Sequence, residues 1–427
     1  ARARWDYQGK YYANIAIRTD GSSRLAAGNQ WAFFPSGGVA WRISEEKFFG
    51  KREWLNSLKL RASYGAVGNS AIDPYQTIAG LSKYDYLFGE DASNKFFAYR
   101  PSMIPNKDLG WEISRTANFG VDFGLWNNRI SGYIEGYITK TSDLLMERTL
   151  PFFTGFSKVW QNIGKTENKG IELNIQANTL KTKSFSWETT VTFARNWNKI
   201  TELLGGGDIR NNSWFIGKPL QVHYNYEMIG VWQLGEEKEA QKYGAIPGDI
   251  KVKDQNNDGS IGELDKVILG QKDPKIIASL LNSFRFGAFD ASINLNMNFG
   301  SLIHPNTYAS LITRDGLRWM PSNFKYWTPD NPTNEYTRAD KLSGYDPFAG
   351  TGGYMKGDYI KIQDITLGYD FSKIMPKNWK ILRARLYAQV RNLGYIYKAC
   401  KNDVSPEAPD FDYNIPTTYT MGINIDF

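Results

Sequence analysis

The sequence predicts an all-β protein, an antiparallel transmembrane outer-membrane β-barrel with long extracellular loops. Three observations lead to this fold class. Apolar and polar residues alternate with a period of two along most of the 427 residues. Short and very long connections alternate between these segments, as in outer-membrane barrels. No stretch approaches the ~18 consecutive apolar residues of a spanning helix, and a barrel strand needs only every second residue to be apolar.

About a dozen segments carry the alternation of a two-faced strand. The clearest is residues 290–299, where five apolar residues alternate with five polar ones. The other strands are expected at residues 11–18, 39–43, 58–64, 117–123, 130–139, 171–178, 185–193, 276–286, 359–371, 382–391 and 419–427.

Two of these strands carry further information. The apolar phase slips within residues 359–371, which predicts a β-bulge. In residues 130–138 isoleucine and glycine alternate with Tyr133 and Tyr137. Either face of that strand therefore fits contact with lipid.

The connections fall into two classes. Gln8-Gly9-Lys10 and Trp126-Asn127-Asn128 have the composition of tight hairpin turns. The long connections are residues 66–112, 196–274, 300–353 and 392–416. A soluble β-sandwich also fits the alternation, but it seldom carries several loops of this length. The last strand ends on the aromatic Phe427, which resembles the C-terminal strand of outer-membrane barrels in general.

The composition argues against several other functions. The net charge of +7 is modest for this length and predicts no nucleic-acid partner. Cys400 is the only cysteine, so no disulfide forms within the chain. His223 and His304 are the only histidines, and neither lies near a Ser or Asp constellation in the sequence. We expect no catalytic residues and two isolated, structural or surface histidines.

The strongest chemical motif is a candidate calcium loop. Its positions 1, 3, 5, 7 and 12 are Asp254, Asn256, Asp258, Ser260 and Asp265. Gly259 at position 6 allows the sharp turn that brings oxygen ligands around a hard cation. The Asp265 side chain at position 12 is shorter than the usual Glu, and no helical pattern flanks the loop. An Asn/Asp-rich turn without an ion is the alternative; a bound Ca²⁺ would stiffen the loop.

Basic and aromatic residues give weaker signals. Arg383, Arg385 and Arg391 alternate on one strand, and Lys59 and Arg61 on another; they either line a lumen or pair with carboxylates, and pairing is commoner. The aromatic residues of the long loops include Trp214, Phe215, Trp232, Trp319, Phe324, Tyr326 and Trp327. We favour a place in the aromatic girdle of the barrel or packing within the loops over contact with sugar rings or peptide side chains, and the sequence identifies no substrate-binding residue.

Segments in order along the chain resemble signatures of the SusC/RagA family of TonB-dependent outer-membrane transporters. They are RTDGSSR (18–24), FPSGGVAWR (34–42), LKLRASYGAVGN (58–69), PNKDLGWE (105–112), NIG with NKGIE (162–172), IGKPL (216–220), the 254–265 loop and YIKIQDITLGY (359–369). The resemblance covers essentially residues 1–427 and implies the C-terminal part of that family's 22-stranded barrel.

The resemblance also implies a function. Family members import glycans or oligopeptides across the outer membrane of Gram-negative cells, with a SusD-like surface lipoprotein as partner. The TonB-ExbB-ExbD complex drives them through an N-terminal TonB box and plug. We expect residues 1–427 to contain neither of these, nor a signal peptide. We therefore expect a SusC-like importer. The alternatives are a passive scaffold barrel in a larger envelope complex and an outer-membrane hydrolase.

Overall fold

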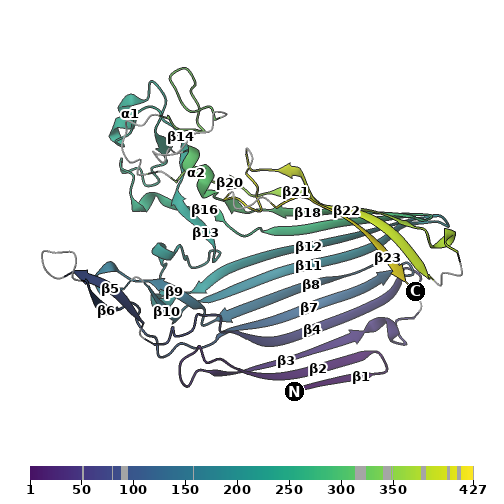
Figure 1. Cartoon of the computed structure of the whole chain (residues 1–427). Helices are drawn as coiled ribbons and strands as arrows, with labels where there is room; N and C mark the ends of the chain where they lie inside the picture. Colours follow the sequence, from purple (N-terminus) through teal and green to yellow (C-terminus); the bar gives the residue numbers. More distant parts are fainter. Residues whose placement is uncertain are drawn as a thin grey trace. The chain divides into compact units, whose positions relative to one another are not determined.

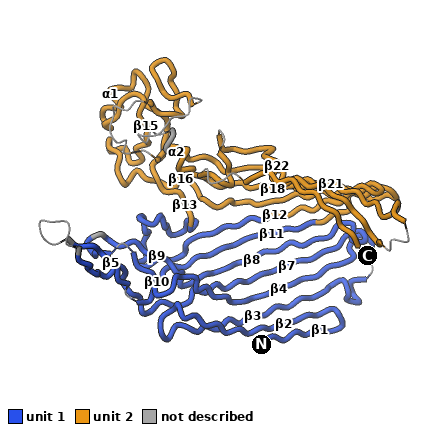
Figure 2. The backbone as a smooth tube through the Cα atoms, viewed as in Figure 1, with its two compact units in different colours: residues 1–175, 194–220 blue, residues 176–193, 221–427 orange. Residues whose placement is uncertain are grey.

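The computed structural model describes residues 1–50, 52–78, 80–87, 95–156, 158–312, 324–339, 348, 350–376, 381–401, 404–410 and 415–426. It forms two compact units (Figure 2): residues 1–175 with 194–220, called unit 1, and residues 176–193 with 221–427, called unit 2. Throughout these described ranges, no helix is both long and apolar enough to span a membrane.

The main feature is a 13-stranded sheet with the strand order β1-β2-β3-β4-β7-β8-β11-β12-β17-β18-β21-β22-β23 (Figure 1). The ladders from β1 to β8 and from β17 to β23 are antiparallel. Unit 1 contains β1 (Arg2–Tyr7), β2 (Tyr11–Gly21), β3 (Trp31–Arg42), β4 (Leu55–Asn69), β7 (Glu112–Leu125) and β8 (Ile130–Ser142). Strands β11 (Lys165–Lys181) and β12 (Phe185–Glu202) contribute residues to both units. Unit 2 contains β17 (Ile276–Phe286), β18 (Phe289–Phe299), β21 (Tyr359–Asp370), β22 (Arg383–Lys398) and β23 (Thr418–Asp426).

Each predicted strand overlaps a strand of this sheet, so alternation identified the wall correctly. The prediction missed β1, which is short and has only three apolar residues, Ala3, Trp5 and Tyr7. Strand β23 ends at Asp426, and the terminal Phe427 lies outside the described residues.

The turns and the bulge also follow the sequence. Gln8 and Gly9 join β1 to β2 with positive φ angles of 54° and 65°, which suit the right-handed twist of a hairpin. Residues 126–128 between β7 and β8 all have positive φ angles. Gln363 is skipped in the pairing of β21 with both neighbouring strands. This extra residue is the predicted β-bulge, and it explains why the apolar phase slips there.

The connections between the strands of this sheet contain secondary structure of their own, which the sequence did not predict; one of them, residues 143–164, is not among the predicted long connections. Their strands are β5 (Leu81–Leu87), β6 (Lys95–Pro101), β9 (Leu145–Thr149), β10 (Lys158–Asn162), β13 (Val222–Tyr226), β14 (Met228–Val231), β15 (Ile250–Val252), β16 (Lys266–Gln271), β19 (Leu302–Ile303) and β20 (Met355–Lys356). These pair as β5-β6, β9-β10, β13-β16, β14-β15 and β19-β20. The helices include α1 (Glu237–Lys242) and α2 (Asn306–Ile312).

The connections also contain the buried apolar clusters. One cluster in unit 2 consists of Tyr308, Tyr336, Cys400 and Val404, with Phe324 and Tyr326 packed against it. One cluster in unit 1 consists of Leu144, Met146 and Ile163, with Trp214 packed against it. Phe215, Trp232 and Trp327 are buried as well. The loop aromatics therefore pack within the loops, as favoured from the sequence; Trp319 lies outside the described residues.

Candidate functional site

Charged residues of the sheet form ion pairs across strands. In unit 1, Arg61 on β4 contacts Asp122 on β7 (Nε to Oδ1, 3.0 Å) and Glu135 on β8 (Nη2 to Oε2, 2.5 Å). In unit 2, Nε and Nη2 of Arg385 both donate to the Asp290 carboxylate, with Nε at 2.8 Å from Oδ1. Such bidentate pairs fix geometry as well as charge. These arginines are thus paired with carboxylates, the commoner of the two alternatives left by the sequence.

A buried ion pair fastens the last long connection to the sheet of unit 2. The Lys361 ammonium on β21 lies 2.6 Å from Oε2 of Glu407, and Lys361 is only 3% exposed. The Tyr395 hydroxyl on β22 donates to the same carboxylate oxygen at 2.8 Å, and the Tyr359 hydroxyl donates to Oε1 at 3.4 Å. Three side chains from two strands therefore hold one loop carboxylate.

The candidate calcium loop folds as a series of tight turns. Asp254 accepts hydrogen bonds from the backbone N–H groups of Asn257 (2.7 Å) and Gly259 (2.9 Å). The nearly fully buried Asp265 accepts from Gly262 N–H (2.7 Å) and from the N–H of residue 255 (2.8 Å). Positive φ angles at Asn257 and Gly259 produce the turn.

The third aspartate of the loop is Asp258. Hydrogen bonds from the Ser260 hydroxyl and the Asn256 amide lower the pKa of Asp258, so it is ionised near neutral pH. In the described part of the chain, no three His, Cys, Asp or Glu side chains gather closely enough to hold a metal ion. The donor set of carboxylate, amide and hydroxyl oxygens fits a hard cation. The calcium site stays a prediction.

The two histidines, 81 positions apart in the sequence, lie around one tyrosine. The ring centroids of His223 and His304 are 6.3 Å apart, and the Tyr354 ring lies 5.1 Å from the first and 4.2 Å from the second. His223 donates its Nε2 proton to the Leu302 carbonyl at 2.9 Å, and burial lowers the pKa of His223 to about 4. The sequence-based expectation of isolated histidines is wrong, because the long connections fold back on one another; a structural role fits their contacts.

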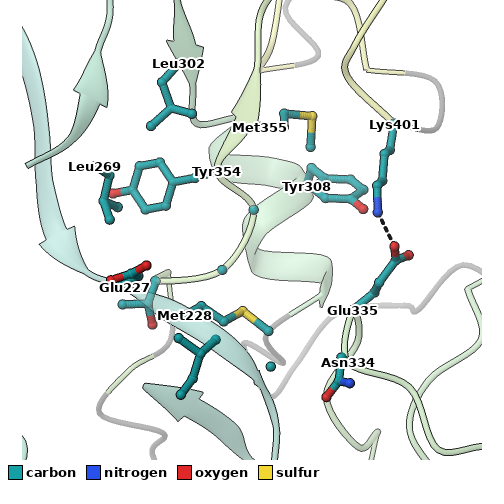
Figure 3. Close-up of a pocket in the computed structure, with 15 residues that line it drawn as sticks. Glu227, Met228, Leu269, Leu302, Tyr308, Asn334, Glu335, Tyr354, Met355 and Lys401 are labelled. Carbon is teal, nitrogen blue, oxygen red and sulfur yellow. Dashed lines mark hydrogen bonds and ion pairs between the residues drawn. The ribbon is translucent and has the colours of Figure 1, made fainter. Parts of the chain in front are cut away.

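Tyr354 also lines a cavity of about 450 Å³ in unit 2 (Figure 3). Its lining comes from separate parts of the connections: residues 227–230, 334–335 and 351–355, with Leu269, Leu302, Tyr308 and Lys401 in addition. Lys401 forms an ion pair with Glu335 on the side of the cavity opposite Leu269 (Figure 3). No sequence motif marks this cavity, since its residues are far apart along the chain.

The comparisons with known proteins identify the family. The family model "TonB dependent receptor-like, beta-barrel" matches residues 1–393. The chain belongs to this family.

Named relatives agree with this assignment. TonB-dependent receptor P26 of Formosa agariphila is 30% identical over 463 residues, which cover 100% of this chain and 45% of the relative. TonB-dependent receptor SusC of Bacteroides thetaiotaomicron is 29% identical over 450 residues, covering 100% of this chain and 43% of SusC. The solved structure of the RagAB peptide transporter matches with a TM-score of 0.82 at 24% identity, covering 100% of this chain and 47% of that chain.

These matches confirm the SusC/RagA-type outer-membrane barrel expected from the sequence. The chain spans somewhat less than half the length of the relatives it matches. The family consists of transporters and receptors, and the chain is therefore no enzyme.

Membership of an outer-membrane barrel family decides which face of the sheet meets lipid. A charged side chain in the hydrocarbon centre costs about 3 kcal/mol, so the face with Arg61 and Glu135 belongs to the lumen. Ile134 and Ile138 point to the opposite face of β8 and are exposed. The isoleucine face of β8 therefore meets lipid, while Tyr137 shares the lumenal face with Glu135.

The β5–β6 hairpin of unit 1 (Figure 2) carries a group of exposed aromatic side chains. In TonB-dependent barrels the long connections are extracellular, and this hairpin lies within the long connection of residues 66–112. Phe97 and Tyr99 are 61% and 65% exposed, and Tyr84, Tyr86 and Phe96 are exposed too. Lys83 and Arg100 lie over the rings of Phe97 and Tyr84.

Proposed function

We propose that this chain forms the C-terminal part of the barrel wall of a SusC-like importer for oligomeric nutrients, glycans or oligopeptides. The family match over residues 1–393 carries the proposal. TonB-ExbB-ExbD supplies the energy through a preceding part of the protein, and the residues of this chain shape the passage. The paired charges at Arg61 and Arg385 favour a passage without free cationic side chains at these positions.

Uptake by whole cells tests this proposal. Cells that carry the complete gene should accumulate a fluorescent oligosaccharide or oligopeptide, and deletion of either this gene or tonB should abolish the accumulation. Uptake that continues without tonB but stops without this gene would instead support a passive barrel. No change in either deletion, over a panel of oligomers that support growth, would support the scaffold alternative.

We propose further that a SusD-like surface lipoprotein docks on the extracellular loops and that the β5–β6 hairpin contributes to this contact. An isolated two-stranded hairpin is marginally stable in water, and clustered exposed aromatics mark interaction sites. The double variant F97S/Y99S should reduce co-purification of the lipoprotein. A control variant, L234S, changes an exposed residue elsewhere in the loops and should leave the complex intact. Equal recovery with both variants would exclude the hairpin from the interface.

The third proposal is that the 254–265 loop binds Ca²⁺ and is stiffened by it. A carboxylate has about four lone-pair sites, so Asp254 and Asp265 can keep their backbone hydrogen bonds while binding a cation. Terbium luminescence titrated with Ca²⁺ should report a site that D254N/D258N removes. Mg²⁺ should compete poorly, because it demands a stricter octahedral geometry. Identical titrations of wild type and variant would exclude this site.

A further inference from the structure

We propose that the cavity beside Tyr354 is a subsite for one apolar side chain of an oligopeptide. This inference rests on the proposed import function and specifies which part of a substrate the loops of unit 2 recognise. The cavity of about 450 Å³ is in the range of small-ligand pockets. At a water's share of liquid volume it would hold about 15 waters, so it is far larger than a packing defect.

One wall of the cavity is fixed before any ligand arrives. The Tyr354 hydroxyl accepts a hydrogen bond from the Asn225 amide at 3.1 Å, and the rings of His223 and His304 pack against the tyrosine ring. His304 Nε2 lies 2.9 Å from the Gly350 carbonyl, on the segment that leads to Tyr354. An aromatic wall that is already ordered loses little entropy on binding.

A glycine brings the same wall close to α2. Gly353 has a φ angle of 88°, and a Cβ at this position would lie 2.8 Å from the Ala309 Cβ. Only glycine therefore permits this approach of the wall to the helix without a shift. The wall is held on one side by the histidines and on the other by backbone contact.

The lining favours an apolar side chain over a sugar. Leu269, Leu302, Met228 and Met355 contribute aliphatic and thioether groups, and Tyr308 contributes a second ring (Figure 3). A sugar ring that filled this apolar part of the lining would bury several hydroxyls there, and each buried hydroxyl without a partner costs about 1–3 kcal/mol. Thioether side chains adapt to apolar groups of varied shape.

Polar groups of both charges surround the apolar lining. Glu227 lies on one side, and the Lys401–Glu335 ion pair lies on the other (Figure 3). A peptide backbone presents donors and acceptors on both sides of each side chain, so it can run along these groups while its side chain enters the cavity. Polar groups that fix orientation around an apolar site are typical of ligand pockets.

Peptide binding to the complete purified transporter tests the subsite. The probes are the peptides Gly-Gly-Leu-Gly-Gly and Gly-Gly-Ser-Gly-Gly and the sugar maltopentaose, each measured by calorimetry. Wild type should bind the leucine peptide at least about tenfold more tightly than the serine peptide, since burial of a leucine side chain is favourable and that of a serine is not.

Two variants that narrow the cavity from different elements sharpen the test. L302W from β19 and M228W from β14 each add an indole ring to the lining and should weaken the preference for leucine, whereas L234W at an exposed loop position should keep it. Two independent substitutions guard against misfolding of one variant. Equal affinity for both peptides in wild type, an unchanged preference in both narrowed variants, or competition by maltopentaose would each overturn the subsite. Normal uptake by cells in any of these cases would leave the import function standing.

Discussion

The Lys361–Glu407 pair allows a quantitative prediction about the last extracellular loop. Replacing Glu407 by Gln leaves the Lys361 ammonium buried without a counter-charge, because Lys361 is only 3% exposed. Breaking one side of a buried pair costs about 3–5 kcal/mol. The amide oxygen introduced by E407Q can still accept a hydrogen bond from the ammonium, which offsets about 1 kcal/mol of this cost. The free energy of opening the loop should therefore fall by about 2–4 kcal/mol, or roughly 30- to 1,000-fold in the opening equilibrium.

Native-state hydrogen exchange of the complete barrel measures this opening. The amides of residues 404–410 should exchange faster in E407Q by that factor, while β4 and β7 in unit 1 keep their protection. E239Q is the matched control, since the Lys242–Glu239 pair is exposed and should contribute less than about 0.5 kcal/mol. The double variant K361M/E407L should recover most of the protection, because it leaves no buried charge. An E407Q effect as small as that of E239Q would refute the reasoning.

Three further predictions concern other sites. Folding lowers the pKa of His223 from 6.5 to about 4, so between these pH values the unfolded chain binds a proton that the folded chain does not. The stability of unit 2 should therefore be complete above pH 6.5 and decrease as the pH drops towards 4. Thermal unfolding of H223Q should not show this decrease. Gly259→Ala should lower the free energy of unfolding by about 1 kcal/mol, because the φ angle of 83° is unfavourable for alanine. Gly353→Ala should lower it more, because the added Cβ would also clash with α2. Denaturant unfolding of the two variants measures this difference. R61M should destabilise unit 1 by about 1 kcal/mol, more than E135Q, because Arg61 pairs with two carboxylates and Glu135 with one arginine; a smaller effect of R61M than of E135Q in the same assay would contradict this ranking.

The wall of the barrel could be predicted from the sequence because its signal is local. Alternation within ten residues defines a strand, and the phase slip around Gln363 located the bulge before any pairing was known. The face of β8 could not be assigned in this way. Ile134 and Tyr137 are both compatible with lipid in isolation, and only the ion pair between Glu135 and Arg61, 74 positions away, separates the two faces.

The loop structure could not be predicted because its contacts are not local. Strand β13 pairs with β16 although 39 residues separate the two strands, and neither strand is long enough to show a convincing period. His223 and His304 carried no signal either, since the residue that joins them, Tyr354, lies 50 positions beyond the second histidine. The calcium motif differs from these contacts, because its residues are adjacent in the sequence and its spacing is visible there. The spacing does not determine the affinity of the folded loop for an ion.

The last long connection links the proposed subsite to the buried anchor, because it carries both Lys401 and Glu407. Apparent affinity falls only by the fraction of molecules in which the site is competent. If the loop opens at a cost of about 5 kcal/mol in wild type, E407Q still leaves about 1–3 kcal/mol, and most molecules stay closed. E407Q should thus accelerate exchange of the loop strongly while changing the affinity for the leucine peptide less than twofold. A tenfold loss of affinity in E407Q would mean that Glu407 sets the position of Lys401 at the cavity directly, and calorimetry of E407Q beside L302W distinguishes these two roles of the loop.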